Sequence, residues 1–240
     1  MTDRIRYSLP DRTDSDWNII CDFDGTIARY DVTDAILETF AAPAWEAVEQ
    51  EWLAGAITAR QCMERQVRLI DARPEALDAF LATVPLVDGF GEFTRYCAAL
   101  GLDLLVVSDG IDYAIKRILS GNGLGAVPVI ANRLRFHGES GYRLEFPYGS
   151  PGCRSGVCKC GVARAEGGHI LLIGDGRSDI CLAGEASFVL ARRGESLHRH
   201  CLDNALPHTA WDDFHDVLRF FAHAPRPGAM READVLTAAG

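Results

Sequence analysis

The sequence contains no apolar run long enough to cross a lipid bilayer, and its charged residues 1–17 lack the apolar centre of a secretory signal. It also lacks an excess of positive charge, because 34 Asp and Glu outnumber 24 Lys and Arg and leave a formal net charge of -10. Nucleic acids and anionic membranes are bound through basic patches that release counterions. We therefore expect a cytoplasmic protein whose partners include neither nucleic acid nor a membrane.

Eight cysteines are present, and without a secretory signal we predict that they are reduced thiols rather than a disulfide framework. Cys153, Cys158 and Cys160 are closely spaced, and three thiolates can form part of a zinc site. One hypothesis is therefore a protein of a different class, a non-catalytic zinc-binding module. The alternative is that these cysteines are small buried or loop residues, because their spacing matches no common zinc knuckle.

The apolar pattern changes from strand-like to helix-like after Thr26 and remains so until about Gly89. Apolar residues recur there at three-to-four spacing, which predicts helices over 32–40, 44–53, 58–70 and 74–84. Such a block is too long for a plain crossover between parallel strands, so we interpret it as an inserted helical cap. The predicted parts of the chain are a core over 1–29 and 88–224, a cap over 30–87 and a flexible tail over 225–240.

The rest of the chain alternates between short apolar strands and helices. Strands are predicted over 17–20, 102–107, 127–134, 169–173 and 188–191, with a hairpin over 134–146. Helices are predicted over 91–100, 111–119, 178–183, 197–204 and 211–221. This alternation predicts an α/β fold with a doubly wound, Rossmann-like parallel sheet, in which the carboxyl ends of the strands meet at the edge where ligands bind.

Two acidic residues, Asp22 and Asp24, stand directly after the first predicted strand. Residues two apart in an extended chain project to the same side, so we expect both carboxylates at the carboxyl end of that strand. Paired carboxylates repel each other unless a cation lies between them, and Mg2+ is the usual cation in such a place. One carboxylate could attack phosphorus and form an aspartyl-phosphate, while the other acts as acid and base. The pair alone is equally compatible with solvated acids at a strand end.

Two further strands end in polar turns, and one lysine could supply the positive charge that a phosphate site needs. Asp175 and Asp179 could complete an oxygen shell around the cation, Asp175 as a direct ligand and Asp179 through water or by orienting the shell. The turn Ser108-Asp109-Gly110 could hold phosphoryl oxygens through the serine hydroxyl and the N–H groups that open a helix. Lys159 could neutralise both the attacking carboxylate and the phosphate.

The order of these motifs resembles the haloacid dehalogenase superfamily, whose aspartate-nucleophile phosphatases use Mg2+. The match extends from about Asn18 to Phe221 and is carried by the stretch 22–26, by Ser108, by Lys159 and by the stretch 174–179. The resemblance implies that Asp22 is the nucleophile, that Asp24 is the acid and base and gives its backbone carbonyl to the metal, and that Asp175 is the third protein ligand. It also implies a helical cap like that of the phosphoserine phosphatase branch, which closes over a small phosphorylated metabolite.

Two families of this branch offer different substrates. The stretch 40–45, and the stretch 146–148 followed by the cysteines around Lys159, are similar to the methionine-salvage phosphatases that act on 2-hydroxy-3-keto-5-methylthiopentenyl 1-phosphate. The stretch 131–134 is similar to the phosphoserine phosphatases instead, and Asp31 matches an acidic position that faces the substrate there. We expect hydrolysis of the first compound or a similar one, with phosphoserine as the alternative. The oligomeric state is left open.

Two substitutions bear on this choice. Phosphoserine phosphatases bind the substrate carboxylate with a cap arginine, and an ungapped alignment places Gln66 at that position with Arg65 beside it. Both families usually have glycine where this chain has Asp109. A carboxylate at that place would repel a phosphate unless it points away from the pocket.

Overall fold

The structure is a computed structural model that describes residues 17–223, and its centre is a seven-stranded sheet with the order β4-β3-β2-β1-β5-β6-β7. All neighbouring strands are parallel except β3 and β4, which form the predicted hairpin. The strands are β1 (Trp17–Cys21), β2 (Asp103–Ile111), β3 (Val129–His137), β4 (Gly141–Glu145), β5 (His169–Gly174), β6 (Phe188–Arg192) and β7 (His208–Trp211). The predicted tail 225–240 and residues 1–16 and 224 of the predicted core lie outside the described residues.

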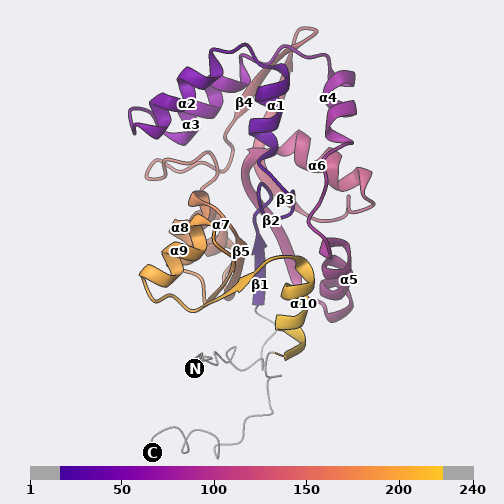
Figure 1. Cartoon of the computed structure of the whole chain (residues 1–240), viewed down its shortest axis with the longest axis vertical. Coiled ribbons are helices and arrows are strands. Elements are labelled where there is room, and N and C mark those ends of the chain that lie inside the picture. The colour runs from indigo at the N-terminus through magenta and orange to yellow at the C-terminus, as the bar shows by residue number, and fades with distance from the viewer. Residues whose placement is uncertain (1–16, 224–240) are drawn as a thin grey trace, which may run out of the picture.

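Helices cover both faces of this sheet, as the predicted doubly wound fold requires (Figure 1). In β1, Ile19 and Cys21 belong to one apolar core and Ile20 belongs to the other, because successive side chains of a strand point to opposite faces. The first core is covered by α5 (Phe90–Leu100), α6 (Asp112–Gly121) and α10 (Phe214–His223). The second is covered by α7 (Lys159–Glu166), α8 (Ile180–Ala183) and α9 (Ser196–Asp203).

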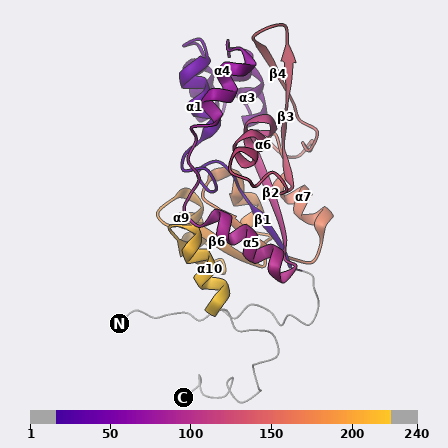
Figure 2. The ribbon, with the colours of Figure 1, turned by 90° about the vertical axis from the view of Figure 1, so that its right-hand side faces the viewer.

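Four helices are inserted between β1 and α5, where the sequence predicts four, although three of them are shorter than predicted. They are α1 (Val32–Phe40), α2 (Trp45–Leu53), α3 (Ala59–Val67) and α4 (Pro74–Leu81), and we call them the helical insert. Asp31 caps α1 by accepting a hydrogen bond from the Asp34 N–H at 2.9 Å, and Thr58 forms a capping box with Gln61 at the start of α3. Figures 1 and 2 show the insert and the β3–β4 hairpin together at the end of the molecule toward which β1 runs.

The strand β2 continues past the point where the sequence predicts its end. Its pairing with β3 shifts between Val107, which lies opposite Ile130, and Ile111, which lies opposite Asn132. Three residues of β2 therefore lie opposite one residue of β3, and the extra residues form a bulge that contains Ser108. The prediction that Asp109 and Gly110 open a helix was wrong, because α6 begins only at Asp112.

A second difference concerns the last strand, since the sequence does not predict β7 at all. This strand has four residues and only Trp211 among them is buried, so it carries little of the apolar alternation that identifies a strand. Its pairing with β6 makes it part of the sheet. Within residues 17–223, no helix combines the length and the apolar character that crossing a membrane requires.

Candidate active site

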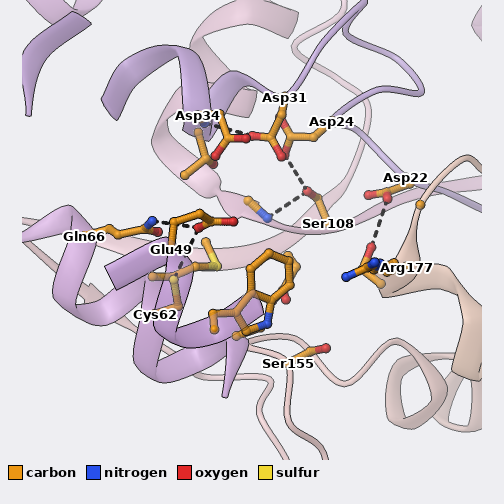
Figure 3. A pocket seen from close by; sticks show the side chains of 18 of the residues that line it. Asp22, Asp24, Asp31, Asp34, Glu49, Cys62, Gln66, Ser108, Ser155 and Arg177 are labelled. Carbon is orange, nitrogen blue, oxygen red and sulfur yellow. Dashed lines mark hydrogen bonds between the residues drawn. The ribbon is translucent and has the colours of Figure 1, made fainter. Parts of the chain in front are cut away.

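A cavity of about 440 Å³ lies at the carboxyl ends of β1, β2 and β5 (Figure 3). Asp22 and Asp24 follow β1, Ser108 lies in the bulge of β2, and Asp175 follows β5. Between β1 and β5 the strand order reverses, which is where open α/β sheets bind ligands. All four residues line the cavity, and so do three further residues singled out from the sequence, namely Asp31, Asp109 and Gly110.

Lys159 lies against Asp22 and joins it to Asp179 in a buried network. The lysine Nζ is 2.8 Å from Asp22 Oδ2, 2.7 Å from Asp179 Oδ1 and 3.1 Å from the hydroxyl of Ser178. Lys159 is only 1% exposed, and both carboxylates are buried as well. Two carboxylates around one ammonium leave a net negative charge in a place with little water, and such a charge is costly unless another cation offsets it.

The protonation of these groups reflects the same excess of negative charge. Burial and the charge of Asp179 raise the pKa of Asp22 well above its ordinary value, although Lys159 opposes the rise. Burial alone would lower the pKa of Lys159, but the charges of Asp179 and Asp22 raise it, so the lysine is protonated. Burial and Asp179 also raise the pKa of Asp175, to about 6. A divalent cation beside these carboxylates would favour their ionised forms.

Carboxylate oxygens of Asp22, Asp175 and Asp179 all lie within 4.8 Å of one another and could hold such a cation. Asp179 already accepts hydrogen bonds on both oxygens, one from Lys159 and two from backbone N–H groups at 3.2 Å. Asp175 accepts a side-chain hydrogen bond on one oxygen, from Thr26 Oγ1 at 2.9 Å. A set of hard oxygen ligands of this kind fits Mg2+, and Asp175 has the freer carboxylate of these two.

Gly25 provides the space that the Asp175 carboxylate occupies. Its φ of 69° lies in the left-handed region, which residues with a Cβ adopt at a cost. A Cβ at this position would also overlap the Asp175 carboxylate. The turn after β1 therefore needs glycine both for its backbone conformation and for the close approach of β5.

Asp24 connects the helical insert to the bulge of β2. Its Oδ1 accepts a hydrogen bond from the N–H of Val32 at 2.8 Å, and its Oδ2 lies 3.4 Å from Ser108 Oγ. The Ser108 hydroxyl in turn accepts the N–H of Gly110 at 2.9 Å. Burial and the charge of Asp31 raise the pKa of Asp24 well above its ordinary value. A raised pKa suits a group that gives a proton to a leaving alcohol.

Asp109 directs its carboxylate to the loop that precedes α7. Its Oδ1 accepts the N–H of Val157 at 2.8 Å and lies 3.2 Å from the side-chain nitrogen of Asn132. Burial raises the pKa of Asp109, while these hydrogen bonds oppose the rise. The added carboxylate therefore has partners of its own, and it holds the backbone two residues before Lys159.

The helical insert forms one end of the cavity and contributes three acids to it. The sequence motifs do not group these acids together. Asp31, Asp34 and Glu49 line this end, and Figure 3 shows Glu49 beside Gln66, across the cavity from Asp22. Gln66 also lines the cavity, whereas Arg65 forms a two-contact ion pair with Glu51, at 2.6 and 2.8 Å, on an exposed surface. A shift of one residue would therefore not bring an arginine into the cavity.

Several lining residues went unnoticed in the sequence because nothing local distinguishes them. Glu49 is one acid among several on α2, and Trp52 fits an ordinary helical face. Arg177 and Ser178 stand inside the stretch 174–179, and this position is the one signal that could have identified them.

The cysteines do not support the zinc-binding hypothesis. Within the described part of the chain, Asp22, Asp175 and Asp179 are the only group of three or more His, Cys, Asp or Glu residues whose ligand atoms converge to within 4.8 Å. Cys153, Cys158 and Cys160 do not form such a group: Cys158 caps the start of α7, Cys160 lies in the first turn of this helix, and Cys153 lies in the preceding loop. All eight cysteines are free thiols, as predicted.

Comparisons with known proteins agree with this geometry. A model of the haloacid dehalogenase-like hydrolases matches residues 19–184. A 2-hydroxy-3-keto-5-methylthiopentenyl-1-phosphate phosphatase of Geobacillus thermodenitrificans is 33% identical over 209 residues, which cover 83% of this chain and 93% of that protein. The enzyme of the same name from Brevibacillus brevis is 33% identical over 211 residues, with 84% and 93% covered.

The fold has counterparts among solved structures. A substrate-bound phosphoserine phosphatase complex superposes with a TM-score of 0.63 and 19% sequence identity, and the match covers 87% of this chain and 99% of that one. This likeness concerns the fold alone. Together with the family match and the two phosphatases above, it confirms the resemblance inferred from the motifs. The chain belongs to the haloacid dehalogenase-like hydrolase family and is a phosphatase.

Proposed function

We propose that this protein is a Mg2+-dependent phosphomonoesterase that works through an aspartyl-phosphate on Asp22. The observation that carries the proposal is the buried network in which Lys159 bridges Asp22 and Asp179 beside the carboxylate of Asp175. The network places a carboxylate at the bottom of a cavity, with a fixed positive charge on one side and room for a cation on the other. Phosphoryl transfer depends on this kind of positioning and charge compensation.

The reaction needs two displacements at phosphorus. In the first, a carboxylate oxygen of Asp22 forms a bond to phosphorus, the ester P–O bond breaks, and the leaving alcohol takes a proton from Asp24. In the second, Asp24 removes a proton from water as the water attacks the phosphoryl group, which releases phosphate and restores Asp22. Ser108 and the backbone of the bulge of β2 contact the phosphoryl oxygens, and Lys159 offsets their charge. Mg2+, held by Asp22, Asp175 and the Asp24 carbonyl and oriented by Asp179, would supply further positive charge for the phosphoryl group.

We propose 2-hydroxy-3-keto-5-methylthiopentenyl 1-phosphate, or a similar compound, as the substrate. Two relatives named for this activity cover most of the chain at 33% identity. The insert end of the cavity contains Trp52, Ala59 and Met63, whose apolar surfaces suit a thioether methyl group. Phosphoserine is disfavoured, because the candidate position for a carboxylate-binding arginine holds Gln66. On this proposal the insert is a cap over 30–87, and a cytoplasmic location stays a prediction from the sequence.

The proposal is tested by measuring phosphate release from this ester and from phosphoserine, with Mg2+ and after its removal with EDTA. We expect turnover that requires Mg2+ and a kcat/KM for the first ester at least about tenfold above that for phosphoserine. Asp22→Asn should lower kcat by about 10^4-fold or more while the circular dichroism spectrum stays unchanged, because the nucleophile is lost. A beryllofluoride adduct should form on Asp22, and an adduct on any other residue would contradict the mechanism.

A further inference from the structure

The insert end of the cavity contains a carboxylate that is held in place but not satisfied. Glu49 Oε2 accepts a hydrogen bond from Gln66 Nε2 at 2.9 Å and lies 3.5 Å from the thiol of Cys62. Among the described residues nothing donates a hydrogen bond to its other oxygen, Oε1. Glu49 lines the cavity that also contains Asp22, so this free acceptor faces the space in which a substrate would lie.

Gln66 adds a second, independent observation. It is 3% exposed, which makes it one of the few buried polar side chains of the structure, and it lines the same cavity. Its side-chain nitrogen is occupied by Glu49, and no described residue donates to its side-chain oxygen. The Gln66 side-chain oxygen keeps some exposure, and because Gln66 lines the cavity, a donor group on a ligand there can form a hydrogen bond with it.

The charged side chains closest to Glu49 and Gln66 at this end of the cavity are acidic. Asp31 and Asp34 line the same end of the cavity as Glu49, and Asp34 has a pKa raised to about 7 by burial and by the charges of Asp31 and Glu49. Their ligand atoms do not converge as a metal site would require, within the part of the chain that the structure describes. A substrate group entering here therefore meets acceptors and negative charge.

Positive charge that could offset these acids is directed elsewhere. Arg154 lines the cavity, but its guanidinium donates to the carbonyls of Gly55 and Ile57, at 3.4 and 3.3 Å. Figure 3 shows Arg177 on the side of the cavity that contains Asp22, apart from Glu49 and Gln66. A carboxylate on the substrate would thus be placed beside Glu49 without a cation to receive it, at a cost of like-charge repulsion in a partly buried site.

We propose that Glu49, positioned by Gln66, determines the substrate specificity of this cavity by accepting a hydrogen bond from a donor group, a hydroxyl or an ammonium, on the leaving-group side of the phosphate ester. The same pair rejects esters that carry a carboxylate there. This inference rests on the proposed phosphomonoesterase function and deepens it, since a 2-hydroxyl group is such a donor. A site built to accept a hydrogen bond discriminates between ligands, because a ligand without the donor leaves its acceptors unpaired.

The test compares glycerol 3-phosphate with 3-phosphoglycerate, which differ in having a hydroxymethyl group or a carboxylate at the far carbon. Dissociation constants are measured by titration calorimetry in Mg2+ with the Asp22→Asn protein, so that binding is read without turnover. We expect glycerol 3-phosphate to bind about tenfold more tightly or better, as a hydrogen bond to a charged acceptor allows. Phosphoethanolamine serves as the ammonium arm, and its affinity relative to glycerol 3-phosphate identifies which donor the site prefers.

The variant that isolates the proposed site is Glu49→Gln, made in the same Asp22→Asn protein. It should reduce the preference for glycerol 3-phosphate over 3-phosphoglycerate to about twofold or less, because the repelling charge is gone. Gln66→Arg should invert the preference, since a guanidinium beside Glu49 would receive the carboxylate. The matched control is Glu46→Gln on the same helix, at an exposed position outside the cavity, and it should leave the preference unchanged.

Equal affinity for the two esters, no binding of either, or a preference that survives Glu49→Gln would overturn the assignment of this site. A failure of the proposed function would give a different result. The protein would still prefer glycerol 3-phosphate to 3-phosphoglycerate, but the unmutated protein would release no phosphate from p-nitrophenyl phosphate in Mg2+. That ester has neither a donor nor a carboxylate on its leaving group, so its hydrolysis reports the reaction at Asp22 separately from specificity.

Discussion

The two ends of the cavity differ in how completely their polar groups are satisfied. At the catalytic end, Lys159, Asp22 and Asp179 are buried and bonded to one another or to backbone N–H groups. At the insert end, Glu49 and Asp34 have carboxylate oxygens to which no described residue donates a hydrogen bond. On the proposed function, the catalytic end is therefore organised before the substrate arrives, and we expect the substrate to complete the insert end.

On the proposed function, this difference gives the two regions separate tasks. A fixed arrangement of charges lowers the barrier to phosphoryl transfer without reorganisation during the reaction. An incomplete set of acceptors selects among substrates, because its free energy depends on what the ligand provides. Changes at the catalytic end should then reduce turnover and stability together, while changes at the insert end should alter specificity and have little effect on folding.

The largest effect is expected from Lys159→Met. The substitution leaves Asp22 and Asp179 buried without a cation, so the free energy of unfolding should fall by about 3–5 kcal/mol and kcat by about 10^3-fold. Urea denaturation and steady-state kinetics measure the two quantities. The matched control is Lys116→Met, which removes an exposed ion pair with Asp112 and should cost less than about 1 kcal/mol. Similar losses in both variants would remove the distinction between the two regions.

The next effect concerns Gly25→Ala. The new methyl group would require a left-handed backbone and would displace the Asp175 carboxylate, so we expect kcat to fall by about 10^2-fold because a ligand is misplaced. Gly55→Ala is a direct control, since Gly55 has a φ of 75° but no atoms near its missing Cβ. Both variants carry the backbone cost of about 1–2 kcal/mol, and only Gly25→Ala should lose activity. Equal activity in the two would show that the contact with Asp175 is unimportant.

A smaller effect is expected from Asp109→Ala. The change removes the acceptor for the Val157 N–H and loosens the backbone that leads into Lys159, so kcat should fall about tenfold with little change in KM. The control is Asp103→Ala at the exposed start of the same strand. If Asp109 contacts the phosphate through its side chain instead, KM will change and kcat will not.

The smallest effect is expected from Asp34→Asn. The pKa of Asp34 is raised from 3.8 to about 7, so the folded state binds this proton more tightly than the unfolded state. The ionised carboxylate therefore costs stability as the pH rises from about 4 through 7, and no cost remains below that window. Removing the charge should raise Tm by only about 1 °C at pH 8, because solvent around this side chain screens the interaction. The rise should be smaller at pH 5, where the carboxyl group of the folded protein is already largely protonated. An equal rise at both pH values would exclude this explanation.

The sequence alone determined the α/β class and predicted that Asp22, Asp24 and Asp175 meet at one edge of the sheet, as they do. Apolar periodicity located the four helices of the insert and α5, and the residues after β1 and β5 were placed together by the rule that parallel strands end at one edge. These inferences succeeded because each depends on a short local pattern or on a general property of parallel sheets. The bulge of β2 and the strand β7 were missed, since both are defined by pairing with a distant strand.

Only the tertiary structure decided where the remaining side chains point. Asp109 could have repelled the phosphate, and it binds Val157 instead because the bulge turns its carboxylate toward the loop. Glu49 and Gln66 stand 17 positions apart on two helices, and their contact depends on how α2 packs against α3. Local periodicity identifies the apolar face of a helix, but the partner of a polar side chain depends on packing between elements that no short stretch of sequence encodes.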